Sequence, residues 1–248
     1  MSPTVIYGRD AELEQLRQQV TRHRSFLLHG PAGVGKTLLL KRLADEFVEM
    51  LYCGESPNTQ TVFRTLAAAL FAKKNRHVVK TCGTSGPNAI KNKSAVSLRG
   101  IVTEALREGG YWIALDHVQS PSQSYATALK DVRSWTGTPI IAASRSEHME
   151  DVGFLLSVFS DRSAKFALRN FDSDTAKEFA TQTAREMQLQ AANRDEAIEK
   201  IVQYSKGNPG AIIAMLRMAV SPKYVAQEHV KLSPLYIDFR LSWGATHG

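Results

Sequence analysis

Short apolar runs alternate with longer segments of helical periodicity through the first two thirds of this chain of 248 residues. Between the runs, apolar residues recur every three or four positions, as on one face of a helix. Short apolar runs separated by helices are typical of strands in a parallel sheet that is covered on both faces. We therefore expect an α/β fold with three layers (αβα), whose strands lie at 25–29, 50–53, 111–115, 139–144 and 164–168.

The pattern changes after Phe171, where the strand-like runs stop. Three segments with helical periodicity follow each other at 172–187, 195–207 and 209–220. Successive helices without strands predict a small helical subdomain, which we expect to form a lid on the core.

These changes divide the chain into three predicted parts. The core is expected over 1–170, the helical lid over 171–232 and a tail over 233–248. The tail is apolar and partly alternating, and its pattern assigns it to neither a helix nor a strand. Within the core, the segment 80–94 is rich in Gly, Ser, Asn and Lys, which predicts a loop.

The segment after the first apolar run carries a complete G-x-x-x-x-G-K-T motif, GPAGVGKT at 30–37. It lies between a strand and a helix, as this motif requires. Backbone N–H groups of such a loop surround a phosphate chain, and the helix N-terminus adds positive potential. Lys36 is expected to reach the β- and γ-phosphates and the Thr37 hydroxyl to bind Mg²⁺. The residues expected to hold ATP or ADP are Pro31, Ala32, Gly33, Val34, Gly35, Lys36, Thr37 and Leu38.

Asp116 ends the apolar run YWIAL, and His117 follows it. A carboxylate at the end of a neighbouring strand is expected to hold the Mg²⁺ shell, so Thr37 and Asp116 form the predicted metal site. The alternative is an Asp that only caps a helix. ATPases usually carry a second acid after this Asp. Since general-base assistance typically contributes about 10²–10⁴-fold, His117 predicts slow turnover with nucleotide binding intact.

Five segments in this order resemble the AAA+/STAND group of P-loop ATPases, particularly its archaeal-ATPase and NB-ARC-like branch. The segments are IYGRDAELEQL, GPAGVGKT, YWIALDH, PIIAASR and YSKGNPGAI, which together span about residues 5–220. The resemblance implies a parallel-sheet P-loop NTPase core with a C-terminal helical lid. Gly210 stands where AAA+ lids often carry an arginine, and this difference favours the STAND-like side.

The resemblance also implies roles for residues outside the glycine-rich loop. Ile6, Tyr7, Gly8 and Arg9 would border the adenine, and Pro209 resembles the lid proline that packs on it. Arg145 resembles the sensor arginine that reads the γ-phosphate, and Arg162 stands where AAA+ oligomers place an arginine finger. The structural alternatives are an ion pair for Arg9, surface positions for Arg145 and Arg162, and a plain turn around Pro209. The expected catalytic set is Lys36, Asp116, His117, Arg145 and Arg162.

The net charge of +7 is concentrated in one segment. Residues 56–103 contain eight Lys and Arg residues and no Asp or Glu. Such a segment predicts salt-sensitive contacts with the phosphates of duplex DNA, and its alternative is a solvated surface without a partner. The candidate contacts are Lys73, Lys74, Arg76, Lys80, Lys91 and Lys93.

The composition is that of an ordinary soluble protein, with 43% hydrophobic and 22% charged residues. The two cysteines, Cys53 and Cys82, have no metal-ligand spacing and suit a reducing compartment. The first residues do not resemble a signal peptide, and no apolar run is long enough to span a membrane, so we expect a cytoplasmic protein.

Together, these features predict an ATP-dependent switch with slow hydrolysis that acts through self-association or a protein partner. One alternative is a DNA-binding ATPase that assembles on DNA, similar to transposition regulators or loaders. A second is a scaffold that binds nucleotide without catalysis.

Overall fold

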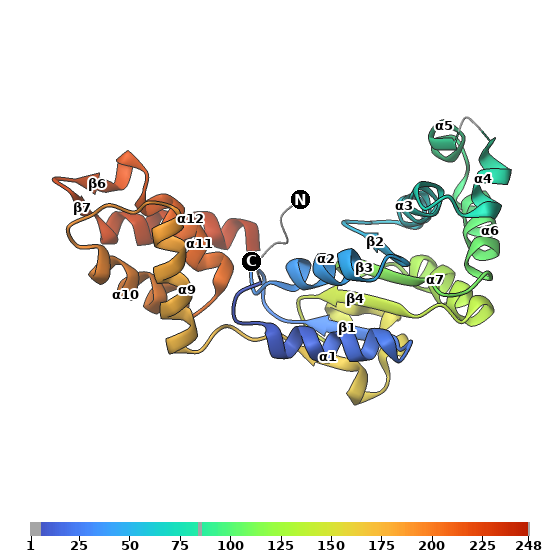
Figure 1. Cartoon of the computed structure of the whole chain (residues 1–248), viewed down its shortest axis with the longest axis horizontal. Helices are drawn as coiled ribbons and strands as arrows, with labels where there is room; N and C mark the ends of the chain where they lie inside the picture. The colour runs from blue at the N-terminus through green and yellow to red at the C-terminus, as the bar shows by residue number, and fades with distance from the viewer. Residues whose placement is uncertain (1–5, 84–85, 248) are drawn as a thin grey trace. The chain divides into compact units, whose positions relative to one another are not determined.

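The structure is a computed structural model that describes residues 6–83 and 86–247, in two compact units (Figure 1). Among these residues, the first unit comprises 11–30 and 36–167. The second comprises 6–10, 31–35 and 168–247. The glycine-rich loop therefore has its two ends in the first unit, whereas its apex groups with the second.

Five parallel strands form the sheet of the first unit, in the order β2-β3-β4-β1-β5. β1 pairs with β4 on one side and with β5 on the other, and β3 pairs with both β2 and β4. All five predicted strands are confirmed, with bounds β1 Phe26–His29, β2 Met50–Cys53, β3 Trp112–Val118, β4 Ile140–Ser144 and β5 Lys165–Ala167. Since the strands are parallel, the segments that follow β1, β3 and β4 meet at one edge of the sheet.

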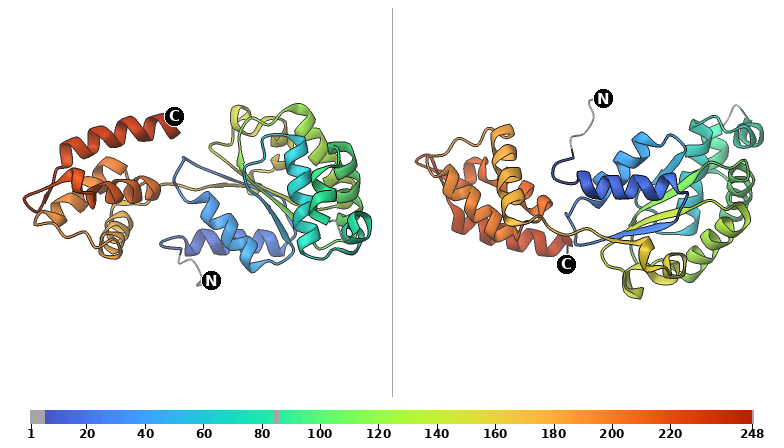
Figure 2. Two further views of the ribbon diagram at one scale, coloured as in Figure 1. Left: turned by 90° about the horizontal axis from the view of Figure 1, so that it is seen from above. Right: turned by 60° about the horizontal axis from the view of Figure 1, so that its bottom comes forward.

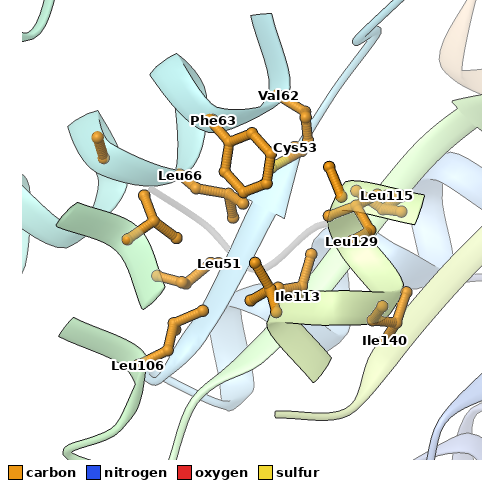
Figure 3. Packing of buried hydrophobic residues seen from close by; sticks show 14 of the residues in the cluster. Leu51, Cys53, Val62, Phe63, Leu66, Leu106, Ile113, Leu115, Leu129 and Ile140 are labelled. Atoms are coloured by element: carbon orange, nitrogen blue, oxygen red, sulfur yellow. The ribbon is translucent and has the colours of Figure 1, made fainter. Parts of the chain in front are cut away.

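Helices cover both faces of this sheet (Figure 2). Alternate strand residues, among them Leu51, Ile113 and Ile140, belong to one core cluster with α3, α6 and α7 (Figure 3). Helix α2 contacts β2, β3 and β4. Arg17 of α1 donates two hydrogen bonds of 2.7 Å to Glu46, the last residue of α2. The bounds are α1 Asp10–Thr21, α2 Lys36–Glu46, α3 Thr59–Ala72, α6 Ala95–Leu106 and α7 Gln123–Thr136.

The prediction of a loop at 80–94 is wrong for most of this segment. Helix α4 (Arg76–Cys82) and helix α5 (Gly86–Lys91) occupy most of it, whereas Thr84 and Ser85 lie outside the described residues. The side chain of Asn75 caps α4 by accepting from the backbone N–H of Val78. Both helices bury apolar residues despite their polar composition, namely Val78, Cys82 and Ile90. One buried residue per turn is too sparse a signal for periodicity to detect in so short a helix.

The chain between β4 and β5 forms short helical turns. Helix α8 (Met149–Val152) and two 3₁₀ segments, η2 (Gly153–Phe159) and η3 (Arg162–Ala164), lead into β5. The 3₁₀ segment η2 buries Leu155 and Phe159 in the core of the first unit.

The second unit contains the three helices predicted for the lid. They are α9 (Ser173–Glu186), α10 (Arg194–Ser205) and α11 (Pro209–Ala219). Alanine-rich faces of these helices, together with Ile201, Ile212 and Met215, form a separate core.

Two expectations for the C-terminal part were incomplete. After η4 (Pro222–Tyr224), a two-residue antiparallel pair, β6 (Val225–Ala226) and β7 (His229–Val230), continues strand structure beyond Phe171. The tail, whose pattern predicts no element, forms α12 (Leu232–His247) and buries Leu235 and Phe239. No helix among the described residues has the length and apolar character needed to cross a membrane.

Position 207 requires a glycine, both because of its backbone angle and because of the atoms around it. Its φ is +73°, and a Cβ at this position would lie 2.2 Å from the carbonyl oxygen of Phe171. Gly100 of α6 is the matched control, because a Cβ there would meet nothing within 4 Å. We expect Gly207→Ala to lower the free energy of unfolding by about 2 kcal/mol or more. Gly100→Ala should raise it by about 0.5–1 kcal/mol. Urea denaturation of the full chain measures both, and equal effects of the two changes would contradict the requirement for glycine at position 207.

Candidate functional site

The loop between β1 and α2 has the backbone of a phosphate-binding loop. Gly33 and Gly35 have φ values of +76° and +109°, a region that favours glycine. A Cβ on Gly35 would meet no atom within 4 Å, so the space beside this part of the loop is open. The ammonium of Lys36 donates to the carbonyl oxygen of Gly30 at 2.6 Å, which closes the loop on itself. The loop therefore fits an anion at the N-terminus of α2.

Lys36 lies partly buried among charged groups at the carboxyl edge of the sheet. Burial lowers the pKa of its ammonium to about 8, Asp116 and Asp151 raise it, and Arg145 lowers it. A partly desolvated cation interacts strongly with a phosphate because little water competes for it. Arg145 follows the end of β4 and is exposed. It is close enough to Lys36 for its positive charge to lower the pKa of the Lys36 ammonium.

Asp116 is a buried carboxylate that two groups orient. Tyr52 of β2 donates its hydroxyl to Asp116 Oδ2 at 2.8 Å, and the backbone N–H of His117 donates to Oδ1 at 2.9 Å. Burial and the bond to Asp116 raise the pKa of Tyr52, so its hydroxyl remains a donor. The negative charge of Asp116 also raises the pKa of Lys36, so the Asp116 carboxylate lies near the glycine-rich loop.

A β-bulge at Asp116 and His117 turns both side chains to one face of the sheet. From Leu115 to Val118 is three residues along β3, whereas their partners in β4, Ala142 and Ser144, are two apart. Leu115 and Val118 consequently both lie in the same core cluster. In a regular strand the two intervening residues would point to opposite faces. Here His117 Nε2 lies 3.6 Å from Asp116 Oδ2.

The bulge requires an unusual backbone angle at His117. Its φ is +52°, a left-handed conformation that costs roughly 1 kcal/mol or more for a residue with a side chain. The imidazole Nε2 then lies 3.4 Å from Thr37 Oγ1. Such strain often occurs beside functional sites, where it directs a side chain toward a ligand.

The first unit brings Lys36, Thr37, Asp116, His117 and Arg145 to one edge of the sheet. Arg162 is not among them. It begins η3, which precedes the amino end of β5, and it is exposed. Because β5 runs parallel to β1, the residues before it lie at the opposite edge from the glycine-rich loop. An exposed arginine there is remote from the phosphate site of its own chain.

The second unit gathers the predicted N-terminal residues around aromatic rings. Tyr7 donates to Glu178 at 2.8 Å and packs on Phe171 and Phe179. Arg9 is buried, donates to the carbonyl of Arg169 at 2.6 Å, and lies 4.4 Å from the ring centroid of Phe171. Backbone and aromatic partners therefore hold the guanidinium of Arg9 in this unit.

The same unit holds the apex of the glycine-rich loop by its carbonyl groups. Asn208 donates its amide to Ala32 at 2.9 Å, the N–H of Gly210 donates to Gly33 at 2.9 Å, and Arg9 donates to Val34 at 3.3 Å. Asn208 also caps α11 by accepting from the backbone N–H of Ala211, and Pro209 begins that helix. Three consecutive carbonyls of the loop apex are therefore bonded to the N-terminal end of α11 or to the N-terminal segment of the chain.

Two residues of these networks were not predicted as site residues. Tyr52 lies near the end of β2, and only the strand order shows that its hydroxyl reaches Asp116. Asn208 belongs to the segment YSKGNPGAI, and its position before Pro209 is a helix N-cap signal. That signal predicts the cap, but the contact with Ala32 depends on the tertiary structure.

The sequence model of the AAA ATPase domain family matches residues 5–134 of the chain. The fold is similar to a Walker-type ATPase of Pyrococcus abyssi, with a TM-score of 0.67 and 18% identity over 97% of this chain and 73% of that chain. No curated protein matches the sequence.

Two further solved structures show the same fold. One is the ORC1 protein of Aeropyrum pernix in complex with DNA, with a TM-score of 0.61 and 16% identity over 96% of this chain and 66% of that chain. The other is a STAND protein with a tetratricopeptide repeat sensor from Pyrococcus horikoshii. Its TM-score is 0.53, with 15% identity over 96% of this chain and 33% of that chain. At these identities the similarity shows the fold, an α/β P-loop NTPase core with a helical C-terminal region.

The pKa of Lys36 predicts how nucleotide binding depends on pH. In the free protein its ammonium loses its proton above about pH 8, and a bound phosphate raises the pKa again. The affinity for ATP, measured in EDTA so that no metal contributes, should therefore fall by about tenfold for each pH unit above 8. Calorimetry in two buffers should show proton uptake on binding in this range. Lys36→Met should bind more weakly and without this dependence. An affinity of the native protein that stays constant from pH 7 to 10 would contradict the assignment.

Proposed function

Because this chain belongs to the AAA ATPase domain family, we propose that it binds ATP with Mg²⁺ and works as a nucleotide-dependent switch with slow hydrolysis. The observation that carries the proposal is the meeting of Lys36, Thr37 and Asp116 at the edge of the sheet where β1 and β3 end. A cation on a lysine, a hydroxyl on the first turn of α2 and a buried carboxylate are the groups that phosphoryl transfer requires.

The donor set fits magnesium. Thr37 Oγ1 and the carboxylate of Asp116 are hard oxygen donors, and both lie within 3.6 Å of the same His117 nitrogen. When bound, Mg²⁺ neutralises charge on the β- and γ-phosphates. In this arrangement Thr37 binds the cation, Asp116 holds its shell, and Tyr52 keeps the carboxylate oriented through its hydroxyl.

Slow hydrolysis follows from the residue after Asp116. A carboxylate at position 117 would accept a proton from the attacking water and add negative charge beside the cation. A neutral imidazole adds no negative charge beside the cation, and the Nε2 of His117 already lies within 3.6 Å of Thr37 Oγ1 and Asp116 Oδ2. We assign the contact with the γ-phosphate to Arg145, whose positive charge already lowers the pKa of Lys36. Arg162, at the other edge of the sheet, is assigned to contact with a second copy of the chain.

The switch acts through the apex of the loop. Donors from Asn208, Gly210 and Arg9 bind the carbonyls of three consecutive loop residues. Any change in the loop on phosphate binding or release therefore alters contacts of α11 and of the N-terminal segment. Tyr7, Gly8 and Pro209, which share a unit with the loop apex, are assigned to the adenine. Different nucleotide states would then present different surfaces of α9–α12 to a partner.

Restoring an acid at position 117 tests the slow step. His117→Glu should raise the rate of ATP hydrolysis in Mg²⁺ by at least about tenfold, because a carboxylate base is returned to the site. Phosphate release measured at saturating ATP gives the rate. Asp116→Asn is the control and should abolish hydrolysis in both backgrounds.

Two results would overturn parts of this proposal. A fast native rate that His117→Ala abolishes would make His117 an effective base. Nucleotide that purifies with the protein and never turns over, even in His117→Glu, would favour the scaffold.

The basic segment supports a second candidate, binding of duplex DNA. Residues 56–103 contain no acid, and their basic residues lie in helices α3–α6, apart from Lys73, Lys74 and Lys93 at the helix ends. Lys74, Arg76, Lys80 and Lys91 are exposed, whereas Lys93 is half-buried and Lys73 donates to the carbonyl of Val48. A similar fold is known in complex with DNA. A cluster of exposed cations gives salt-dependent contacts with phosphates.

Removing exposed cations tests DNA binding. Lys74→Ala/Lys80→Ala/Lys91→Ala should weaken binding to a labelled duplex and reduce the slope of log affinity against log salt by about 0.9 for each lost phosphate contact. Fluorescence anisotropy at several salt concentrations, with ATP present, measures both. The control Lys177→Ala/Lys200→Ala/Lys223→Ala removes equal charge from the second unit. Equal losses in the two variants, or no binding of the native protein at low salt, would reject this candidate.

A further inference from the structure

The imidazole of His117 lies close to both groups expected at the cation site. Its Nε2 is 3.4 Å from Thr37 Oγ1 and 3.6 Å from Asp116 Oδ2. Two atoms bound to one cation at about 2.1 Å are about 3.0 Å apart at octahedral angles and about 3.4 Å apart at tetrahedral angles. The separation of Nε2 from Thr37 Oγ1, which is within hydrogen-bond distance, exceeds the octahedral value by about 0.4 Å, so a small movement of the exposed ring would place both atoms on one octahedral cation.

Core packing does not account for this position. The side chain of His117 is 61% exposed, whereas that of Asp116 is 1% exposed. An exposed ring gains little from burial, yet the backbone carries a β-bulge and a φ of +52° that direct it toward Thr37. A ligand that holds the ring at this place accounts for both observations.

We propose that Nε2 of His117 binds the nucleotide-associated cation directly, and that this nitrogen makes the site prefer Co²⁺ or Mn²⁺ over Mg²⁺. The inference rests on the proposed function, because the nucleotide supplies part of the coordination. Mg²⁺ prefers oxygen ligands, whereas a site with imidazole nitrogen binds later first-row metals more tightly, in the order Mn²⁺ below Co²⁺. Thr37 Oγ1 completes the protein ligands, and the Asp116 carboxylate balances the charge.

The geometry also makes cation binding depend on nucleotide. The described part of the chain contains no group of three or more His, Cys, Asp and Glu side chains that could hold a metal ion. One imidazole, one hydroxyl and one carboxylate that Tyr52 already engages are a weak site alone. Phosphate oxygens must supply the other ligands, so Co²⁺ should bind tightly only when a nucleotide is present.

The first test compares cations in the full chain. The affinity for the methylene analogue of ATP, which is not hydrolysed, is measured by calorimetry with Mg²⁺ or Co²⁺. The preference for Co²⁺, taken as the ratio of the two affinities, should be at least tenfold larger in the native protein than in His117→Ala. His77→Ala, which removes a histidine from α4, is the matched control and should keep the native ratio. Thermal unfolding of all three proteins checks that the ratio does not reflect a folding defect.

The second test detects the bond itself and does not depend on activity. Pulsed electron paramagnetic resonance of Mn²⁺ with the methylene analogue should show coupling to a directly bound nitrogen. Labelling the protein with [¹⁵N]histidine should change this coupling, His117→Ala should remove it, and His77→Ala should leave it. The methylene analogue is used because it has no bridging nitrogen.

The outcomes separate this inference from the proposed function. Tight binding of the analogue without nitrogen coupling, and with the same cation ratio in His117→Ala, would overturn the role of His117 and leave nucleotide binding intact. Failure of the native protein to bind the analogue with any of the three cations would overturn the proposed function itself. Tight binding of Co²⁺ without nucleotide would contradict the ligand set.

Discussion

The pairing of β4 with both β1 and β3 is the constraint on which the candidate site depends. It fixes the distance between two segments that are about eighty residues apart in sequence, the loop after β1 and the carboxylate on β3. The first four residues of β4, from Ile140 to Ala143, are apolar and fully buried. Core packing on both faces of the sheet therefore positions polar groups that lie outside the core.

The β-bulge in β3 adds a second level of positioning. Without it, Asp116 and His117 would face opposite sides of the sheet, and only one of them would approach α2. With it, Leu115 and Val118 stay in the same core, and the two residues between them share the other face. An irregularity of one residue thus sets which side chains lie beside Thr37 at the candidate site, and a left-handed backbone at His117 accompanies it.

The second unit holds the apex of the glycine-rich loop through hydrogen bonds. Its helices have their own core, and the groups that bind the loop apex come from a helix N-terminus and one buried arginine. These bonds are made to carbonyls and engage no N–H group of the loop, although the N–H of Val34 donates to the carbonyl of Pro31 at 3.4 Å within the loop. The acceptor side of this short loop is therefore bonded to the N-terminal end of α11 and to the N-terminal segment of the chain.

The sequence by itself determined the elements with strong local signals. Apolar runs predicted five strands, periodicity predicted the three lid helices, and the motif at 30–37 predicted the loop, because each depends on neighbouring residues in the chain. Short helices α4 and α5 and the helix α12 were not predicted, since their patterns are weak or mixed. Only the tertiary structure decided the bulge at His117, the bond from Tyr52 to Asp116 and the contact of Asn208 with Ala32. These features join residues distant in sequence, and pairing and packing of the whole unit, rather than local propensity, place them.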